Sequence, residues 1–303
     1  MLVDLDRLRT LREFADRGSV TAAARALHCT PSAVSQQLRA LQAEVGLALT
    51  EPAGRGLRLT DAGRALVARA DEVLSALDRA EAELDTYRRS PRGRVRLAIF
   101  PSAGLLLLPG LLPRFAARDG LDVDVRDVDM TPPEVPGLLA DHDVVVTHRD
   151  EHAPPFAGER IDVVPLLREP LDVALPPGHP LGDRAHVELT DLATEQWISV
   201  DVGFPVDDVL LSLATRTGVR PRVAYRFNDF RITEALVASG HGIALLPRYT
   251  MDTRRVLRRP LAGIRAARVV EAVLRAGTRR PAVTAVLDAL RTEAAEVGAD
   301  PPA

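Results

Sequence analysis

The sequence predicts an α/β protein preceded by a separate helical unit of about 90 residues. Up to Tyr87 the apolar residues mostly recur at helical spacing, as Leu5, Leu8 and Leu11 do. Beyond Gly93, short apolar strands alternate with helical segments, which is typical of an α/β layout. The 303 residues suffice for two or three packed units, since a domain usually holds roughly 100 to 200 residues.

The composition excludes several kinds of function. A net charge of −3 shows no strong basic excess, so any nucleic-acid contact must be local. All 39 basic residues are arginine, which excludes lysine Schiff-base chemistry and a phosphate-loop lysine. Cys29 is the only cysteine and cannot form an internal disulfide. Because no nucleophile elbow or HExxH motif occurs either, we expect no enzymatic activity and no cofactor.

The N-terminus and the apolar segments predict a cytoplasmic protein. The first ten residues, MLVDLDRLRT, carry acids where a secretory signal needs a basic patch and an apolar core. The most apolar stretch, near 105–112, contains Pro109 and Gly110 and is far shorter than the roughly 20 residues that span a bilayer. We therefore expect no membrane segment.

Capping residues divide the first unit into three helices. Asp4 can cap the first helix and Gly18 can end it, after which Ser19 can cap a second, alanine-rich helix. Thr30 offers a capping oxygen for a third helix, and Pro31 takes its first position, where a missing amide hydrogen is harmless. The third helix is expected to end near Val45.

The third helix has one apolar and one polar face. At 100° per residue, the apolar face consists of Val34, Leu38, Leu41 and Val45. The opposite face carries the hydrogen-bonding residues Ser32, Ser35, Gln36 and Arg39. Such short polar side chains suit contacts with base edges and phosphates in a major groove. An ordinary solvated face is the alternative, because any surface helix has a polar side.

A hairpin and a long helix are predicted next. Residues 49–59 contain Pro52, Gly54 and Gly56 between apolar positions, which indicates a small wing that carries Arg55 and Arg58. The arginine fork is well suited to contact phosphates or a minor groove.

The long helix begins at Thr60 and Asp61 and would extend about 40 Å. Its apolar residues follow a heptad pattern: Leu66, Ala70, Val73, Leu77, Ala80, Leu84 and Tyr87. A helix of this length needs a partner, so we predict dimerisation with a second copy of the chain. Packing against the rest of the same chain is the alternative.

Residues 90–93 break the long helix and mark a domain boundary. The segments with strand character that follow are 95–99, 121–125, 144–146, 161–175, 197–200, 223–227 and 243–246. Because helical segments separate them, we expect parallel sheets.

The segment GSVTAAARALHCTPSAVSQQLRALQAEVGLAL, at 18–49, resembles the winged helix-turn-helix of LysR-type transcriptional regulators. It shares the paired alanines Ala22 and Ala23, the capped turn before Pro31 and the ending at Gly46, and GRGLRLTDAG follows at 54–63. The order of the parts also agrees, so the resemblance covers essentially the whole chain.

The resemblance implies the fold and the domain boundaries. The expected fold is α/β with an all-α winged helix-turn-helix N-terminal domain, a long linker helix and a two-subdomain effector domain like a periplasmic binding protein. The corresponding ranges are 1–60 for the DNA-binding domain, 61–90 for the dimerisation helix and 91–303 for the effector-binding domain. Subdomain I would comprise about 93–164 and 267–303, and subdomain II about 165–266.

The resemblance also implies the residues that contact DNA. The matching positions are Thr30, Pro31, Ser32, Ser35, Gln36, Arg39 and, on the wing, Arg55. Gln36 stands where the family often has arginine; glutamine pairs bidentately with adenine, whereas arginine prefers guanine.

An effector site is expected between the two subdomains. Ligands in such folds bind at the carboxyl ends of strands, near helix N-termini. By similar layout, the expected contacts are Ser102, Thr131, Thr147, Ser199, Phe204 and Asn228. A polar residue at a strand end is more often a helix cap than a ligand contact, so that alternative stays open.

The resulting hypothesis is a homodimeric, possibly homotetrameric, regulator that binds promoter DNA and a small-molecule effector. The alternatives are a cytoplasmic solute-binding protein without DNA function and a regulator with no small-molecule effector. Two further patterns remain open: a metal site in the histidine-rich stretch 141–152, and a redox role for Cys29.

Overall fold

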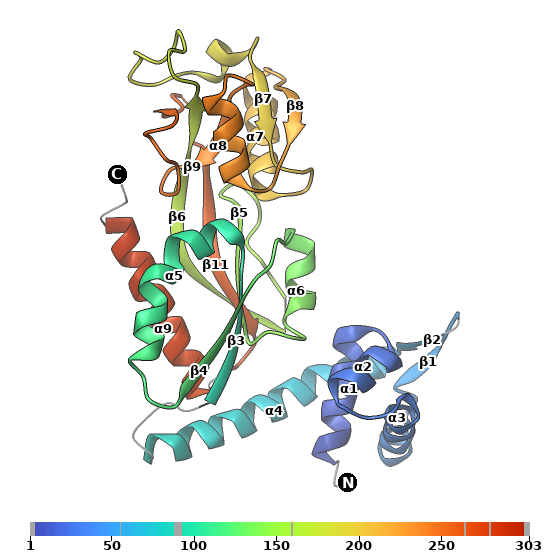
Figure 1. Cartoon of the computed structure of the whole chain (residues 1–303). Coiled ribbons are helices and arrows are strands. Elements are labelled where there is room, and N and C mark those ends of the chain that lie inside the picture. Colours follow the sequence, from blue (N-terminus) through green and yellow to red (C-terminus); the bar gives the residue numbers. More distant parts are fainter. Residues whose placement is uncertain are drawn as a thin grey trace.

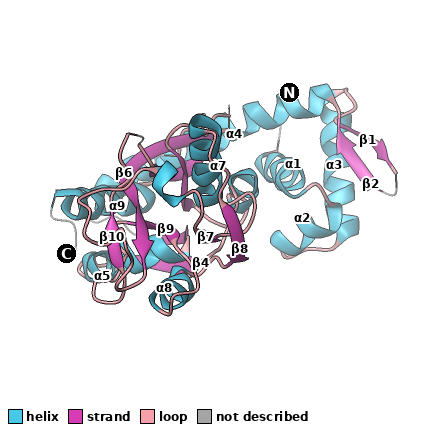
Figure 2. Ribbon diagram, turned by 90° about the horizontal axis from the view of Figure 1, so that it is seen from above, coloured by secondary structure: helices cyan, strands magenta, loops and turns pink. Residues whose placement is uncertain are grey.

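The computed structural model describes residues 4–54, 56–87, 93–158, 160–263, 265–278 and 280–299. A small head and a long helix lie at one side of a larger α/β effector domain (Figure 1). Seen from above, the head stands beside this domain and leaves the outer face of its third helix uncovered (Figure 2). Within the described part of the chain, no helix combines the length and apolar character needed to cross a membrane.

The head forms where the capping residues predicted it. Its elements are α1 (Leu5–Arg17), α2 (Val20–Ala26), α3 (Pro31–Val45), β1 (Thr50–Ala53) and β2 (Gly56–Leu59). The Asp4 carboxylate accepts from the Asp6 amide at 2.8 Å, and Gly18 ends α1 with φ 62°. Thr30 accepts from the Ala33 amide at 3.2 Å at the start of α3. A core around Leu11, Phe14, Val34 and Leu41 holds the helices together.

The long helix α4 (Asp61–Tyr87) connects the head with the effector domain. Val67 and Ala70 are buried in the head core, so the first turns of α4 belong to the head. Farther along, Leu74 is buried and the Ser75 hydroxyl donates to the carbonyl of Ala276 at 3.2 Å. One face of α4 is thus packed against its own chain.

Subdomain I is a sheet with helices on both faces. It contains β3 (Gly93–Ile99), β4 (Leu121–Asp127), β5 (Val144–Asp150) and β11 (Ala267–Arg275). The helices α5 (Pro101–Ala116) and α9 (Pro281–Ala299) lie side by side on one face (Figure 1). The short elements η1 (Pro132–Glu134) and α6 (Val135–Leu138) lie on the other face (Figure 1).

Subdomain II packs around the buried Trp197. Its elements are η2 (Leu189–Leu192), β7 (Gln196–Ser199), α7 (Pro205–Thr217), β8 (Arg222–Arg226), α8 (Phe230–Ala238), β9 (Ala244–Pro247) and β10 (Leu257–Arg259). The strand β6 (Ile161–Leu175) joins the subdomains, because its first part pairs with β11 and its last part pairs with β9 and β10. The chain returns to subdomain I along β11, so two strands cross between the subdomains.

The expectation of parallel sheets is only partly right. The strands β3, β4 and β5 pair in parallel, as do β7 and β8. The pairings of β11 with β5 and β6, and of β6 with β9 and β10, are antiparallel. The reason is the two crossings: β6 leaves subdomain I and β11 comes back beside it in the opposite direction.

Ion pairs tie the head to subdomain I. Asp16 at the end of α1 lies 2.8 Å from Arg160 and 2.7 Å from Arg275, measured between carboxylate oxygens and guanidinium nitrogens. Arg17 pairs with Asp141 at 2.7 Å. These contacts fix how the head sits against the effector domain.

Candidate DNA-binding face and ligand cleft

The outer face of α3 is exposed and polar. Val34, Leu38 and Leu41 are buried on the opposite face. The predicted contact residues Thr30, Pro31, Ser32, Gln36 and Arg39 are exposed, and Ser35 is half-buried. The side chains of Gln36 and Arg39 have no hydrogen bond or ion pair with another described residue, so their donors and acceptors are available to a partner.

The smaller polar groups on this face are engaged locally. The Thr30 hydroxyl caps α3, and the Ser35 hydroxyl donates to the carbonyl of Pro31 at 3.0 Å. The Oε1 of Gln42 accepts from the amides of Leu49 and Thr50 at 3.0 and 2.8 Å, which positions the wing relative to α3.

The wing presents an arginine beside α3. Arg58 on β2 is exposed and pairs with Glu51 on β1 at 2.8 Å. Arg55, which the sequence assigns to the wing tip, lies outside the described residues.

The predicted dimerisation residues occupy two different environments. Leu66 and Ala70 pack into the head core, and Leu77 is half-buried. Ala80 is exposed, as are Val73 (42%) and Leu84 (59%). The side chain of Tyr87 lies outside the described ones. The exposed part of the seam, at Val73, Ala80 and Leu84, is therefore an apolar ridge that no described residue covers.

A second candidate site is the cleft between the subdomains. It is lined from both sides by Phe100, Pro101, Ser102, Asp129, His148, Val200, Phe204, Val206, Asn228, Phe230 and Arg268. Ser102 lies in the first turn of α5, Phe204 and Val206 lie at the start of α7, and Phe230 begins α8. The N-termini of three helices therefore converge on the cleft. A lining of aromatic groups with a few polar ones is typical of small-molecule sites.

Arg268 is the cationic side chain that lines the cleft. It is fully buried, and its Nη2 lies 2.7 Å from the Glu169 carboxylate. Its Nη1 donates to the Ser102 hydroxyl at 2.9 Å. The guanidinium carbon lies 5.1 Å and 5.8 Å from the ring centroids of Phe100 and Phe230, which is within cation–π distance. Arg268 thus orients the Ser102 hydroxyl at the start of α5.

His148 brings an unpaired polar atom into the cleft. Its ring centroid lies 4.2 Å from that of Phe100, and its buried Nδ1 has no hydrogen-bond partner. Burial, and next the charge of Arg268, lowers the pKa of His148 well below its usual value of 6.5. The imidazole is therefore neutral at pH 7, and its Nδ1 can donate a hydrogen bond to a ligand or accept one from it, depending on the tautomer.

The cleft closes through contacts between the subdomains. The Asn228 amide donates to Asp129 at 2.8 Å, and the Ser212 hydroxyl donates to Asp150 at 2.9 Å. The free volume is about 30 Å³, whereas ligand pockets hold roughly 300 to 1,000 Å³. This arrangement is a closed form with room for no more than water.

The remaining predicted effector contacts do not line this cavity. Thr131 caps η1 through Glu134, and the buried Ser199 lies 3.3 Å from Asp207. Thr147 is buried in β5, and its hydroxyl has no hydrogen-bond partner. The structure brings together Ser102, Phe204 and Asn228 among the predicted contacts.

Two family descriptions match the chain. Residues 5–64 match the bacterial regulatory helix-turn-helix protein of the lysR family, and residues 88–295 match the LysR substrate binding domain. The chain belongs to the LysR family. These proteins are transcriptional regulators, not enzymes.

Curated relatives of this LysR regulator are similar over most of their length. The RuBisCO operon transcriptional regulator of Allochromatium vinosum is 28% identical over 305 residues, which cover 98% of each chain. A probable hydrogen peroxide-inducible genes activator of Mycobacterium avium is 30% identical over 242 residues, covering 79% of this chain and 76% of its own length.

Solved structures share the fold of this LysR chain. A full-length OxyR variant from Pseudomonas aeruginosa has a TM-score of 0.67 at 21% identity, covering 96% of this chain and 98% of its own. Full-length CbnR in complex with its target DNA has a TM-score of 0.54 at 23% identity, covering 96% and 99%.

Sequence reasoning missed the two central groups of the LysR cleft. Arg268 lies at the start of β11, and no local pattern marks it, because its partner Glu169 is 99 positions away. His148 belongs to the stretch that suggested a metal site. The continuous apolar run of Val144 to Val146 just before it, which is typical of a buried strand, was the signal that could have placed it in the sheet.

The sequence left two other patterns open, the histidine-rich stretch 141–152 and Cys29. Among the described residues, no group of three histidine, cysteine, aspartate or glutamate side chains is placed to hold a metal ion. His142 Nδ1 lies 3.0 Å from the carbonyl of Leu138, and Cys29 is exposed in the turn before α3.

Proposed function

We propose that this LysR regulator binds promoter DNA as a homodimer and that a small molecule bound in the cleft changes the spacing of the two heads. The observation that carries the proposal is the closed cleft whose walls come from both subdomains, with Ser102 and His148 on one side and Phe204 and Asn228 on the other. Any ligand that enters must change the angle between these walls.

The DNA contacts are assigned to α3 and the wing. Gln36 and Arg39 project from α3 without partners among the described residues, next to the smaller groups of Thr30, Pro31, Ser32 and Ser35. We assign base recognition to Gln36 and phosphate contacts to Arg39 and Arg55. Since the target is chromosomal DNA, the same proposal places the protein in the cytoplasm.

The dimer is assigned to the exposed ridge of α4. Val73, Ala80 and Leu84 follow one another at heptad spacing and are exposed in the single chain. Burying such a ridge against a second α4 removes apolar surface from water. The helix α5 exposes Leu105 and Leu112, one heptad apart, which offers a second surface for a tetramer.

The cleft suits a small molecule with an apolar body and one anionic or hydrogen-bonding end. The three phenylalanines Phe100, Phe204 and Phe230 provide apolar walls. The helix N-termini, Arg268 and the unpaired Nδ1 of His148 provide the polar contacts. Because the closed cavity is so small, binding requires that the contact between Asn228 and Asp129 opens.

DNA binding tests the proposal directly. We expect the purified chain to bind the region upstream of its own gene, with an affinity that falls steeply with salt as counterions are released. Gln36→Ala should preserve the dimer and change the sequence preference by about 1–3 kcal/mol at one base pair. A dimer that ignores its upstream region at low salt would favour the solute-binding alternative.

Ligand binding is tested by thermal unfolding with a panel of small organic acids. A ligand at 100 times its dissociation constant should stabilise the protein by about 2.7 kcal/mol. The variant Ser102→Ala should weaken this stabilisation, whereas Ser239→Ala, at an exposed helix end, should not. A wild-type chain that responds to no compound, yet binds DNA, would support a regulator without an effector.

A further inference from the structure

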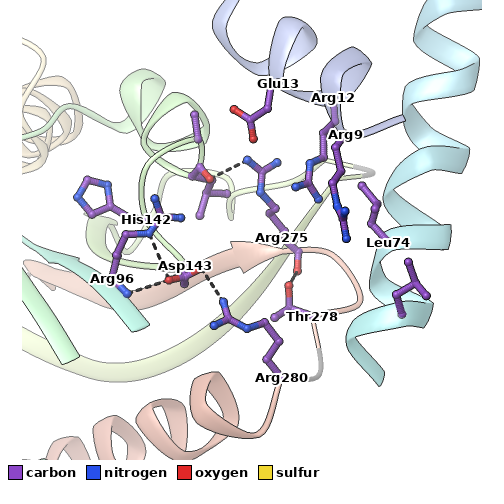
Figure 3. A pocket seen from close by; sticks show the side chains of 13 residues that line it. Arg9, Arg12, Glu13, Leu74, Arg96, His142, Asp143, Arg275, Thr278 and Arg280 are labelled. Atoms are coloured by element: carbon purple, nitrogen blue, oxygen red, sulfur yellow. Dashed lines mark hydrogen bonds and ion pairs between the residues drawn. The ribbon is translucent and has the colours of Figure 1, made fainter. Parts of the chain in front are cut away.

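A group of arginines lines a cavity that lies away from the effector cleft. This cavity of about 420 Å³ opens between α1, α4 and subdomain I (Figure 3). Five arginines line it, together with the carboxylates of Glu13 and Asp143: Arg9, Arg12, Arg96, Arg275 and Arg280. Its volume lies in the range of metabolite pockets, whereas the closed effector cleft is far below that range.

The arginines reach the cavity from two directions. Arg9 and Arg12 point down from α1, and Arg275 of β11 lies directly opposite Arg12 (Figure 3). Arg96 of β3 and Arg280, before α9, lie on the far side of the same space. Leu74 and Leu77 of α4 close one wall, so the cavity is bounded by both the head and the effector domain.

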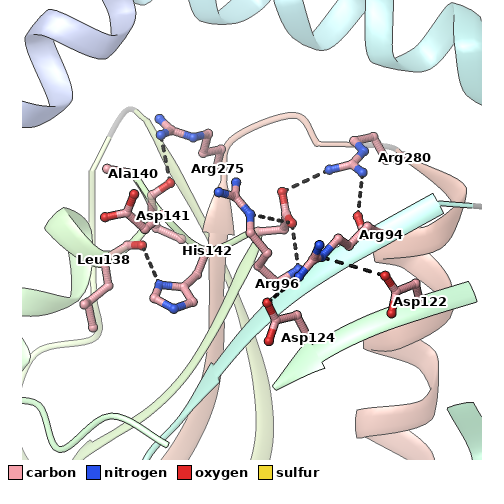
Figure 4. A network of polar contacts seen from close by, with 12 residues as sticks. Arg94, Arg96, Asp122, Asp124, Leu138, Ala140, Asp141, His142, Arg275 and Arg280 are labelled. Carbon is pink, nitrogen blue, oxygen red and sulfur yellow. Dashed lines mark hydrogen bonds and ion pairs between the residues drawn. The ribbon is translucent and has the colours of Figure 1, made fainter. Parts of the chain in front are cut away.

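The carboxylates near the cavity are already shared among several arginines. Asp143 pairs with both Arg96, at 3.5 Å, and Arg280, at 2.9 Å (Figure 3). Figure 4 shows these two arginines beside Arg94 in the same network of polar contacts. Asp16 serves Arg275 and also Arg160. The other lining carboxylate, Glu13, lies 3.0 Å from Arg17, which is outside the cavity. The lining therefore carries more positive than negative charge.

Among the arginines of the cavity, Arg12 makes no hydrogen bond or ion pair with a described residue, and its buried Nε has no acceptor. Burial, and next the charge of Arg275, lowers the pKa of Arg12 below its usual value, and the nearby carboxylates of Glu13, Asp71 and Asp16 offset this only in part. A buried guanidinium beside a second one is unfavourable unless an anion compensates both.

We infer that this cavity is a second ligand site, for a small anion with several negatively charged oxygens, held between Arg12 of the head and Arg96, Arg275 and Arg280 of the effector domain. Planar guanidinium groups bind carboxylates and phosphates in a bidentate manner, so both polycarboxylates and phosphorylated metabolites share the required chemistry. A bound anion would bridge head and effector domain. The site is independent of the effector cleft and adds to the proposed function.

Isothermal titration of the full-length chain with pyrophosphate and, separately, with citrate tests the inference. We expect saturable binding of at least one probe with one site per chain. Arg12→Gln and Arg280→Gln, which change the two walls separately, should each weaken binding about tenfold or more, because each removes a charge-assisted hydrogen bond. Preference for pyrophosphate would identify phosphate oxygens, and preference for citrate would identify carboxylates.

Three control variants distinguish this site from other anion-binding surfaces. Arg39→Gln alters the DNA-binding face, Ser102→Ala alters the effector cleft, and Arg126→Gln alters an exposed arginine elsewhere on subdomain I. All three should bind the probe with wild-type affinity. Thermal unfolding without probe verifies that each variant is folded. The inference is overturned if neither probe binds, if folded Arg12 and Arg280 variants bind as tightly as wild type, or if Arg39→Gln removes the binding.

Discussion

His148 couples the stability of the cleft to pH. The unfolded chain binds a proton at this residue below pH 6.5, whereas burial keeps the folded imidazole neutral to much lower pH. The free energy of unfolding therefore decreases as the pH falls below 6.5. Between pH 7.5 and pH 5.5 this single group should contribute a loss on the order of 1 kcal/mol.

Urea unfolding of wild type and His148→Phe at the two pH values measures this contribution. Phenylalanine keeps an aromatic ring beside Phe100 and cannot be protonated, so the loss of stability on acidification should be smaller in the variant by an amount on the order of 1 kcal/mol. An identical pH dependence in wild type and His148→Phe would contradict a neutral buried imidazole.

The buried pair of Arg268 and Glu169 gives a second prediction at the scale of single residues. Both side chains are fully buried, 2.7 Å apart. Arg268→Met leaves the Glu169 carboxylate buried without its partner, which should cost about 3–5 kcal/mol of stability. Removing both charges, in Arg268→Met with Glu169→Gln, should restore most of this loss. Denaturant unfolding checks both variants, and equal stability of the single and double variants would show that the charge pair is not the cause.

At the scale of elements, α4 carries the dimer prediction. Leu84 is 59% exposed on the outer face, so Leu84→Arg leaves the packing of the single chain intact and places a charge in the expected seam. We expect this variant to run as a monomer and to lose DNA affinity by at least tenfold, since two heads no longer act together. Sedimentation and a DNA titration measure both effects.

Arg79→Gln supplies the matched change on the same helix, at an exposed position outside the heptad series. This variant should remain dimeric and bind DNA normally. If Leu84→Arg also stays dimeric with full affinity, α4 does not form the interface.

The elements themselves could be predicted from the sequence, because their signals are local. Asp4, Ser19 and Thr30 each cap a helix through an amide two or three residues away. The pairing of strands could not be predicted in this way. The insertion of β11 between β5 and β6 depends on contacts between distant segments, and so does the buried pair of Arg268 and Glu169. The sequence therefore predicted three of the cleft residues but not its charged centre.

At the scale of the whole molecule, two regions join moving parts. The cleft joins the subdomains through Asn228 and Asp129, and the arginine-lined cavity joins the head to subdomain I. Since β6 runs through both subdomains and β11 pairs with its first part, we expect a change in the angle of the cleft to reach the ends of these strands near Arg160 and Arg275. Arg160 and Arg275 form ion pairs with Asp16 of the head, so these pairs connect the cleft to the head through the two strands.

A substitution of Asp16 should break this connection between the head and subdomain I. Its side chain is 8% exposed and pairs with Arg160 and Arg275. Asp16→Asn removes the charge but keeps the shape, and losing a largely buried ion-pair partner costs on the order of 3 kcal/mol, which shifts a two-state equilibrium by about 100-fold. We expect the head to separate from subdomain I, with a larger maximum dimension in small-angle X-ray scattering.

Asp6→Asn, at an exposed carboxylate of the same helix that pairs with Arg9 within α1, should scatter like wild type. Unchanged scattering of a folded Asp16→Asn protein would mean that packing of α4, and not this ion pair, holds the head in place.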